Sequence, residues 1–227
     1  MKRVIISILF AVFAATALQA QTIVTSDTSV EYLLPEGRVG FQAGIGYRTG
    51  KIDKSLDSFQ REFVEKLRPG FCFAFDFEYY FADAVGFGIK IQDLHSSASA
   101  DVKKGVYTYT TIDETIDIGY LGPLLSYRFF DPAWKNVVFM NVGAGCLLYH
   151  DEGASGYYTA SQDKFAPGVS CDLGFDLHLN ETLYFGLSVS MTLGAMILDQ
   201  SDQNNTTVII AEDLSYVSAS AGFRLAF

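Results

Sequence analysis

The chain has 227 residues, a formal net charge of −10 at pH 7, 19% charged residues and 15% aromatic residues. A chain this acidic does not suit nucleic acid as a partner, and its length corresponds to one domain. After the first 20 residues, no apolar run is long enough for a membrane-spanning helix. The apolar residues are instead spread through short alternating segments, which is typical of a membrane β-barrel.

The N-terminus has the three parts of a secretory signal peptide. Lys2 and Arg3 are basic, Val4 to Leu18 is nearly all apolar, and Ala20 is a small residue at the expected cleavage site. The apolar run is shorter than the ~20 residues of a spanning helix, so cleavage is favoured over a retained anchor. Loss of the two basic residues changes the formal charge from −10 to −12. The predicted division is a signal peptide at 1–20, a periplasmic arm at 21–37 and an outer-membrane barrel domain at 38–227.

Eight segments alternate apolar residues with small or polar ones, which is the side-chain period of a strand. The clearest segment is 71–81, where every odd position is Phe or Tyr. An aromatic stripe of this length is typical of a barrel wall that faces lipid. The last segment ends on Phe227, which suggests the closing strand of an outer-membrane barrel. The predicted strands are 39–48, 71–81, 85–92, 120–129, 138–148, 168–179, 183–193 and 218–227.

The connections between these strands alternate between short and long. The short ones are 82–84, 131–135 and 180–182, and the long ones are 49–68, 96–110, 151–164 and 199–213. Short periplasmic turns and long extracellular loops are characteristic of membrane barrels. The sequence therefore predicts an all-β, eight-stranded antiparallel transmembrane barrel in the outer membrane of a Gram-negative bacterium, with both termini in the periplasm.

The first long loop carries apolar residues at helical spacing. Leu56, Phe59, Phe63 and Leu67 recur every three to four residues. One interpretation is a short amphipathic helix at the cell surface, and the other is that 63–67 extend the second strand. Exposed apolar residues in this loop would suit contact with a protein or a polysaccharide.

Charged residues at inward positions form the main candidate site. Antiparallel pairing across the 82–84 turn places Asp76 opposite Lys90, where an ion pair is expected. Eight strands leave room for little but side chains, so a structural network that fills the barrel is favoured over a conduction path. The predicted network comprises Arg48, Asp76, Glu78, Lys90, Arg128, Asp172, Asp176 and Arg224.

Catalytic and metal motifs are weak in this sequence. His95-Ser96-Ser97 and His150-Asp151 fall at the predicted rim, but no spacing rule connects them. Three cysteines, Cys72, Cys146 and Cys171, lack a metal-ligand spacing. We therefore expect no catalytic residues, no enzymatic activity, no cofactor and no metal, with a rim-loop enzyme as the third alternative.

The segment Gly119–Phe129, GYLGPLLSYRF, resembles a stretch of the PorT-like outer-membrane β-barrel proteins of Bacteroidota, which are small barrels similar to OmpX and OmpA. Gly122 stands where that family often has an acidic residue. The resemblance implies a barrel in the outer membrane and carries no catalytic residues. The expected function is a structural or surface-interaction role through the extracellular loops. The alternative is a small pore or a component associated with transport or secretion. The expected partners are outer-membrane lipid and a protein or polysaccharide at the loops.

Overall fold

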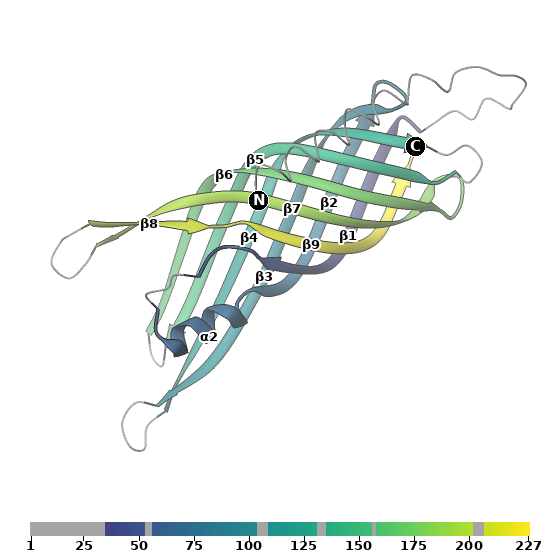
Figure 1. Cartoon of the computed structure of the whole chain (residues 1–227). Helices are drawn as coiled ribbons and strands as arrows, with labels where there is room; N and C mark the ends of the chain where they lie inside the picture. The colour runs from purple at the N-terminus through teal and green to yellow at the C-terminus, as the bar shows by residue number, and fades with distance from the viewer. Residues whose placement is uncertain (1–34, 53–55, 104–108, 131–134, 156–157, 202–206) are drawn as a thin grey trace, which may run out of the picture. The chain divides into compact units, whose positions relative to one another are not determined.

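Eight strands form a closed antiparallel ring in the computed structural model (Figure 1), which describes residues 35–52, 56–103, 109–130, 135–155, 158–201 and 207–227. Each strand pairs with its neighbour in the chain, and the last strand closes on the first. The ring consists of β1 (Gly37–Arg48), β2 (Pro69–Tyr80), β3 (Val85–Lys103), β4 (Tyr109–Phe130), β5 (Val137–Ser155), β6 (Tyr158–His178), β7 (Leu183–Ser201) and β9 (Tyr216–Ala226). The predicted eight-stranded antiparallel barrel is confirmed, whereas the predicted signal peptide and most of the arm lie outside the described residues.

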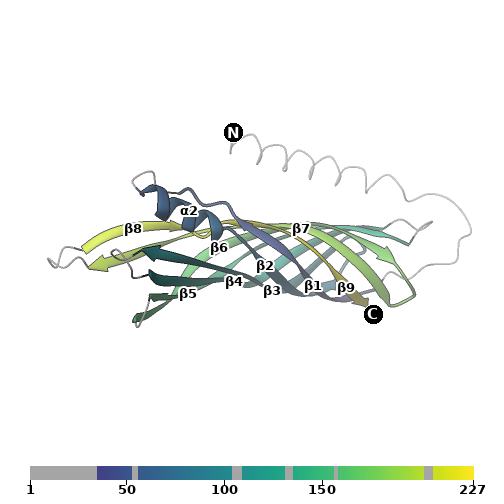
Figure 2. The same cartoon turned by 90° about the horizontal axis from the view of Figure 1, so that it is seen from below.

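The two ends of the barrel differ in their connections. At one end, which we call the short-turn end, lie the turns after β2, β4 and β6 and the two ends of the ring. There Gly37 and Phe227 exchange backbone hydrogen bonds of 2.7 and 2.9 Å, so the ring is closed up to its last residue. The opposite end, which we call the long-loop end, carries the helix α2 (Ser58–Lys66) and the additional strand β8 (Thr207–Asp213), as Figures 1 and 2 show.

The strands continue far beyond the predicted bounds at the long-loop end. β3 to β7 have 19 to 22 residues, whereas a transmembrane strand needs ~9–11. Most of the residues predicted as the last three long loops are therefore in strands. The alternation of apolar and polar residues did not predict these extensions, because the outward residues of the extended parts are mostly polar. β8, which the sequence analysis did not predict, pairs with β7.

The extended parts of β3 to β6 form one sheet, which we call the protruding sheet. Its pairings run to Lys103↔Tyr109 between β3 and β4 and to Ser155↔Tyr158 between β5 and β6. The pairing of β6 with β7 stops at Gly168↔Gly194, and beyond that point β7 pairs with β8. The protruding sheet is thus separated from the β7–β8 hairpin.

The first long loop forms the helix, so the alternative of an extended second strand is wrong. Asp57 caps it reciprocally, because the Gln60 N–H donates to the Asp57 carboxylate at 2.7 Å and the Asp57 N–H donates to the Gln60 side chain at 3.1 Å. Phe63 and Leu67 are only 8% and 1% exposed. The expectation of an exposed apolar partner surface is therefore wrong for these two residues, which instead cover the barrel interior.

The barrel interior has an apolar half and a polar half. Near the long-loop end, side chains from α2 and the strands form one hydrophobic cluster that includes Leu67, Leu94, Ile118, Leu147 and Tyr216. Toward the short-turn end, the inward side chains are mainly charged or hydrogen-bonding. Among the residues that the structure describes, no helix is long and apolar enough to span a membrane.

Candidate functional site

The charged inward side chains gather in the polar half of the interior. The Arg38 guanidinium donates to Glu78 and to Asp176 at 2.6 Å each, and Arg224 also pairs with Asp176. Lys90 Nζ lies 2.5 Å from an Asp172 carboxylate oxygen. Four basic and four acidic side chains, each at most 8% exposed, balance one another: Arg38, Lys90, Arg128, Arg224, Asp76, Glu78, Asp172 and Asp176. We call these eight residues the lumen network.

Neutral side chains complete the hydrogen bonding of the carboxylates. Asn141 and Tyr80 each donate to Glu78 at 2.7 Å. Ser190 donates to Asp172 at 2.6 Å, and Gln42 donates to the carboxylate of Asp76 at 3.0 Å. A buried carboxylate needs such donors because an unpaired charge in a low-dielectric interior is costly.

Aromatic rings cover the guanidinium groups of the lumen network. The guanidinium carbons of Arg38 and Arg224 lie 4.2 and 4.3 Å from the centroid of the Phe139 ring. That of Arg128 lies 3.7 Å from the Tyr80 ring centroid. These contacts fix the positions of the cations and fill the space between them.

The predicted ion pair between Asp76 and Lys90 does not form, although the predicted register is correct. Lys90 extends across the interior from β3 to Asp172 on β6, and Asp76 accepts from Gln42 on β1. In a narrow barrel, a long side chain reaches the opposite wall as readily as the adjacent strand. Strand register therefore predicts which Cα atoms lie opposite each other, but it does not predict which carboxylate the Lys90 ammonium group pairs with.

The structure differs from the sequence analysis in the placement of two arginines. Arg48 lies apart from the lumen network, at the long-loop end, where it pairs with Glu212 at 2.9 Å. Arg38 belongs to the lumen network but was not predicted, because the first strand was taken to begin at 39. The even-numbered residues of β1 face inward, so the even number of Arg38 could have predicted its inward direction. Arg128 is in the network region and donates to the backbone oxygens of Pro35 and Asp83 at 2.7 Å.

Side chains fill the interior over the height of the lumen network. A cavity between Asp76, Lys90, Asn141 and Arg224 has a volume of only about 10 Å³, which is about the space that one water molecule needs. The Asp76 Oδ2 and Arg224 Nε atoms at this cavity lie 3.8 Å apart, so these two charged groups also pair. Between this cavity and the long-loop end, the hydrophobic cluster occupies the interior. Between the described residues, this arrangement leaves little room for water at the level of the lumen network.

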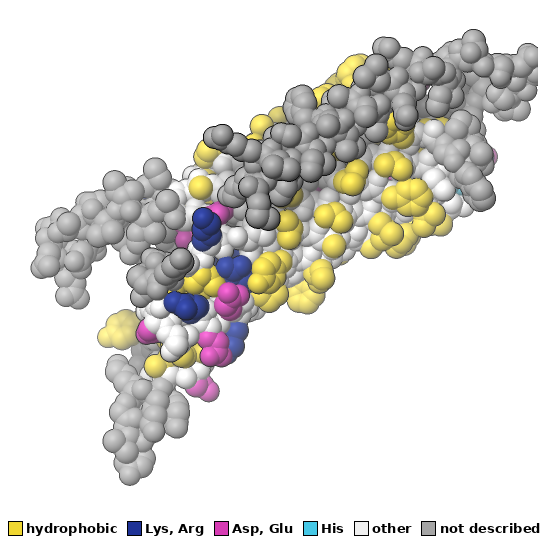
Figure 3. Space-filling view, in the orientation of Figure 1, with side chains coloured by type: hydrophobic (Ala, Val, Ile, Leu, Met, Phe, Trp, Pro, Cys, Tyr) yellow, Lys and Arg dark blue, Asp and Glu magenta, His cyan; other side chains and the backbone are white. Residues whose placement is uncertain are grey.

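The outer wall is apolar over the height of β1 and β2. Five outward residues of β2 are 36–67% exposed although all of them are aromatic: Phe71, Phe73, Phe75, Phe77 and Tyr79. Figure 3 shows hydrophobic side chains over the wall and charged ones gathered near α2 at the long-loop end. Aromatic pairs lie toward the short-turn end, with Phe81 and Phe87 at 6.2 Å between centroids. An apolar band with aromatic residues at its border is typical of the surface of a membrane barrel.

Two histidine–aspartate pairs lie on the outer face of the protruding sheet, next to the apolar band. His95 Nδ1 lies 2.5 Å from an Asp117 carboxylate oxygen, and His150 Nδ1 lies 2.6 Å from one of Asp163. Asp117 also faces His150 in the pairing of β4 with β5. The four side chains thus form a row across β3, β4, β5 and β6. The hydrogen bond to the Asp163 carboxylate raises the pKa of His150 above its ordinary value.

The candidate catalytic groups at the rim are divided between the two faces of the wall. Ser96 is inward-facing and 1% exposed, whereas His95 is on the outer face of β3. Asp151 accepts a hydrogen bond from Tyr149 at 3.1 Å, and His150 contacts Asp163 instead. Of the two serines that follow it, His95 therefore shares the outer face with Ser97 and not with Ser96, and His150 pairs with Asp163 and not with Asp151.

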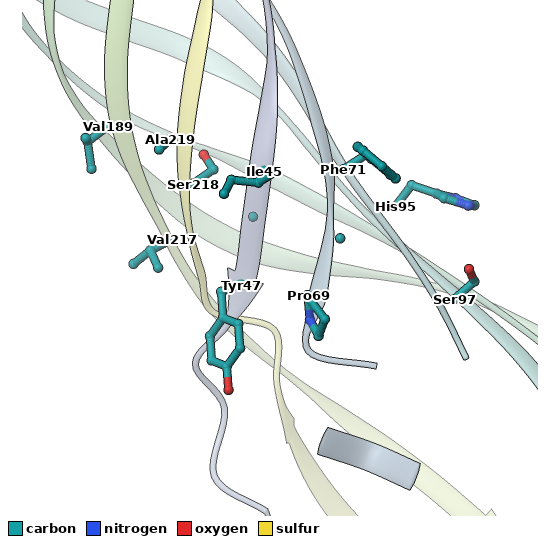
Figure 4. A pocket seen from close by; sticks show the side chains of 12 residues that line it. Ile45, Tyr47, Pro69, Phe71, His95, Ser97, Val189, Val217, Ser218 and Ala219 are labelled. Carbon is teal, nitrogen blue, oxygen red and sulfur yellow. The ribbon is translucent and has the colours of Figure 1, made fainter. Parts of the chain in front are cut away.

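The outer wall also contains a groove of about 860 Å³, shown in Figure 4. It crosses β7, β9, β1, β2 and β3 at the border of the apolar band. Its outward side chains include Ile45, Phe71, Val189, Val217 and Ala219. Tyr47, His95 and Ser97 add polar atoms to the lining.

The structure is similar to solved outer-membrane proteins. OprG from Pseudomonas aeruginosa matches with a TM-score of 0.51 and 16% identity, over 86% of this chain and 97% of that chain. Neisserial surface protein A matches with a TM-score of 0.48 and 13% identity, over 85% and 97%. The Yersinia pestis protein Ail, solved with the heparin analogue sucrose octasulfate, matches with a TM-score of 0.41 and 13% identity, over 83% and 99%.

No protein-family model matches the chain, and no curated protein matches it. Identities this low establish the fold alone, and among these three structures the likeness to OprG carries that conclusion. This chain is therefore an eight-stranded antiparallel β-barrel with the fold of outer-membrane barrel proteins.

Proposed function

We propose that the chain is a non-enzymatic outer-membrane protein that acts through its protruding sheet at the cell surface. The observation that carries the proposal is the exposed aromatic stripe of β2, Phe71 to Tyr79, on a closed ring of strands. Water would not favour so many exposed aromatic side chains on one wall, whereas lipid would. The filled interior supports a structural or interaction role over a pore.

The proposed orientation places the short-turn end in the periplasm and the protruding sheet outside the cell. Membrane barrels have short periplasmic turns and long extracellular connections, and the two ends of this barrel differ in that way. The signal peptide at 1–20 and the arm at 21–37 belong to the same proposal. The resemblance to PorT-like proteins of Bacteroidota remains a prediction about the family.

The protruding sheet presents an acidic surface. Six carboxylates occupy outward positions on it: Asp93, Asp101, Asp113, Asp117, Glu152 and Asp163. Such a surface favours a cationic segment of a protein partner and disfavours anionic polysaccharide, and the attraction weakens as salt screens it. The helix α2 does not supply this surface, because its Phe63 and Leu67 are buried.

The membrane location is tested by fractionation and gel mobility. We expect the protein in the outer-membrane fraction, with an electrophoretic mobility that changes on heating and an N-terminus at Gln21 by mass spectrometry. Protease added to intact cells should cleave at the long-loop end only. Recovery of the native protein in the soluble periplasm would contradict the proposal.

The acidic surface is tested with a labelled oligolysine peptide on protein embedded in vesicles. The variant Asp113→Asn/Glu152→Gln should bind the peptide several-fold more weakly at low salt. A matched control, Glu62→Gln/Glu181→Gln, removes the same charge away from the sheet and should bind as the wild type does. Equal weakening in both variants would show a net-charge effect and no binding surface.

A further inference from the structure

We propose that the groove in the outer wall binds one acyl chain of a membrane lipid, with the lipid headgroup at the long-loop end. This inference rests on the membrane location proposed above and adds a specific lipid site to it. The groove spans about 860 Å³ and is lined mainly by apolar side chains.

The groove arises from the sizes of the outward side chains. Ala219 on β9 is paired with Val189 on β7 and with Ile45 on β1, and Ile45 is paired with Phe71 on β2. Ile45 and Phe71 are each 67% exposed and Val189 is 60% exposed, so they stand out from the wall. A small residue between large neighbours leaves a furrow along the strands, and Figure 4 shows these side chains around it.

The polarity of the groove changes along its length. Ile45, Val189 and Ala219 line the part within the apolar band, and Tyr47, His95 and Ser97 lie where the wall becomes polar. Figure 4 shows the Tyr47 ring beyond the end of β1, with its hydroxyl directed away from Ile45. The Arg68 guanidinium carbon lies 5.7 Å from the centroid of this ring. An apolar furrow that ends among hydroxyl, imidazole and guanidinium groups matches the two parts of a lipid.

The backbone around the groove argues against a peptide or a second copy adding a strand. Ile45, Phe71, Val189 and Ala219 all lie within paired ladders, so their strands present no free edge at the groove. A strand would need such an edge to form main-chain hydrogen bonds. An acyl chain needs only apolar contact, which the furrow offers on its floor and on both sides.

The test compares two Ala→Phe variants on the lipid-facing wall. Ala219→Phe fills the groove, whereas Ala43→Phe adds the same side chain at an exposed outward position outside the groove lining. The full-length protein, processed on export, is inserted into vesicles of phosphatidylglycerol and phosphatidylethanolamine and then transferred to detergent. Native mass spectrometry counts the phospholipids that stay bound as collision energy rises.

We expect one phospholipid to be retained by the wild type and by Ala43→Phe, and at least tenfold less retention by Ala219→Phe. If phosphatidylglycerol and phosphatidylethanolamine are both retained, the result supports recognition of the acyl chain by the groove, because the two lipids differ in their headgroups. Equal retention by all three proteins, or no retained lipid in the wild type, would overturn the site. Heat-modified gel mobility separates the two proposals: if the barrel inserts but the variants do not differ, only the lipid site fails. If the wild type does not insert into vesicles at all, both proposals fail.

Discussion

The lumen network predicts strong energetic coupling between Lys90 and Asp172, which lie on β3 and β6. Lys90 is 3% exposed and its Nζ lies 2.5 Å from Asp172. Removing one partner of a buried ion pair costs about 3–5 kcal/mol because the remaining charge is left uncompensated. Asp172→Leu and Lys90→Met should therefore each destabilise the barrel by about that amount.

The double variant should be much more stable than the sum of the single changes implies, because no isolated charge remains. Ser190 would lose its carboxylate acceptor, now at 2.6 Å, which costs about 1–3 kcal/mol. The expected coupling energy is thus at least about 3 kcal/mol. Urea unfolding of the protein in lipid vesicles, followed by circular dichroism, measures each free energy of unfolding.

The control cycle pairs Lys90→Met with Asp76→Leu. These residues face each other in the register of β2 and β3, but Lys90 is paired elsewhere. The coupling in this cycle should be well below that of Lys90 with Asp172. Equal or greater coupling with Asp76 would refute the cross-barrel arrangement and restore the pairing expected from register.

Three further predictions concern the long-loop end and the interior. Planar-bilayer recordings of the purified protein should show no stable porin-like conductance, since side chains fill the interior, and such a conductance would support the pore alternative. Phe63→Ala should destabilise the barrel end by about 3–5 kcal/mol and speed proteolysis of the segment 49–68, whereas Phe59→Ala, at an exposed position, should change little. The pKa of His150 measured by NMR should lie above the ordinary value of a histidine, and Asp163→Asn should lower this pKa toward the ordinary value. Because the pKa of His150 is raised in the folded state, its pairing with Asp163 stabilises the folded protein fully at pH values below the pKa of an unfolded histidine. This stabilisation disappears as the pH rises through the pKa of His150 in the folded protein.

The sequence by itself determined the number of strands in the closed ring, their alternation and the inward or outward direction of most side chains. Phe71 to Phe81 could be assigned to the outer wall because a strand has a side-chain period of two and lipid selects apolar residues on one face only. The helix in the first long loop was visible as one of two alternatives, from its three-to-four spacing. These features depend on local geometry and on the solvent at each face.

Only the tertiary structure decided the strand lengths, the partners of the charged residues and the outer groove. The protruding sheet was hidden because alternation carries no signal where both faces of a strand are polar. Lys90 pairs with Asp172 and not with Asp76 because closure of the ring brings opposite walls within reach of a long side chain. The groove exists because pairing places Ala219 between Val189 and Ile45, and side-chain size at neighbouring positions becomes a surface shape only after strands distant in the chain have paired.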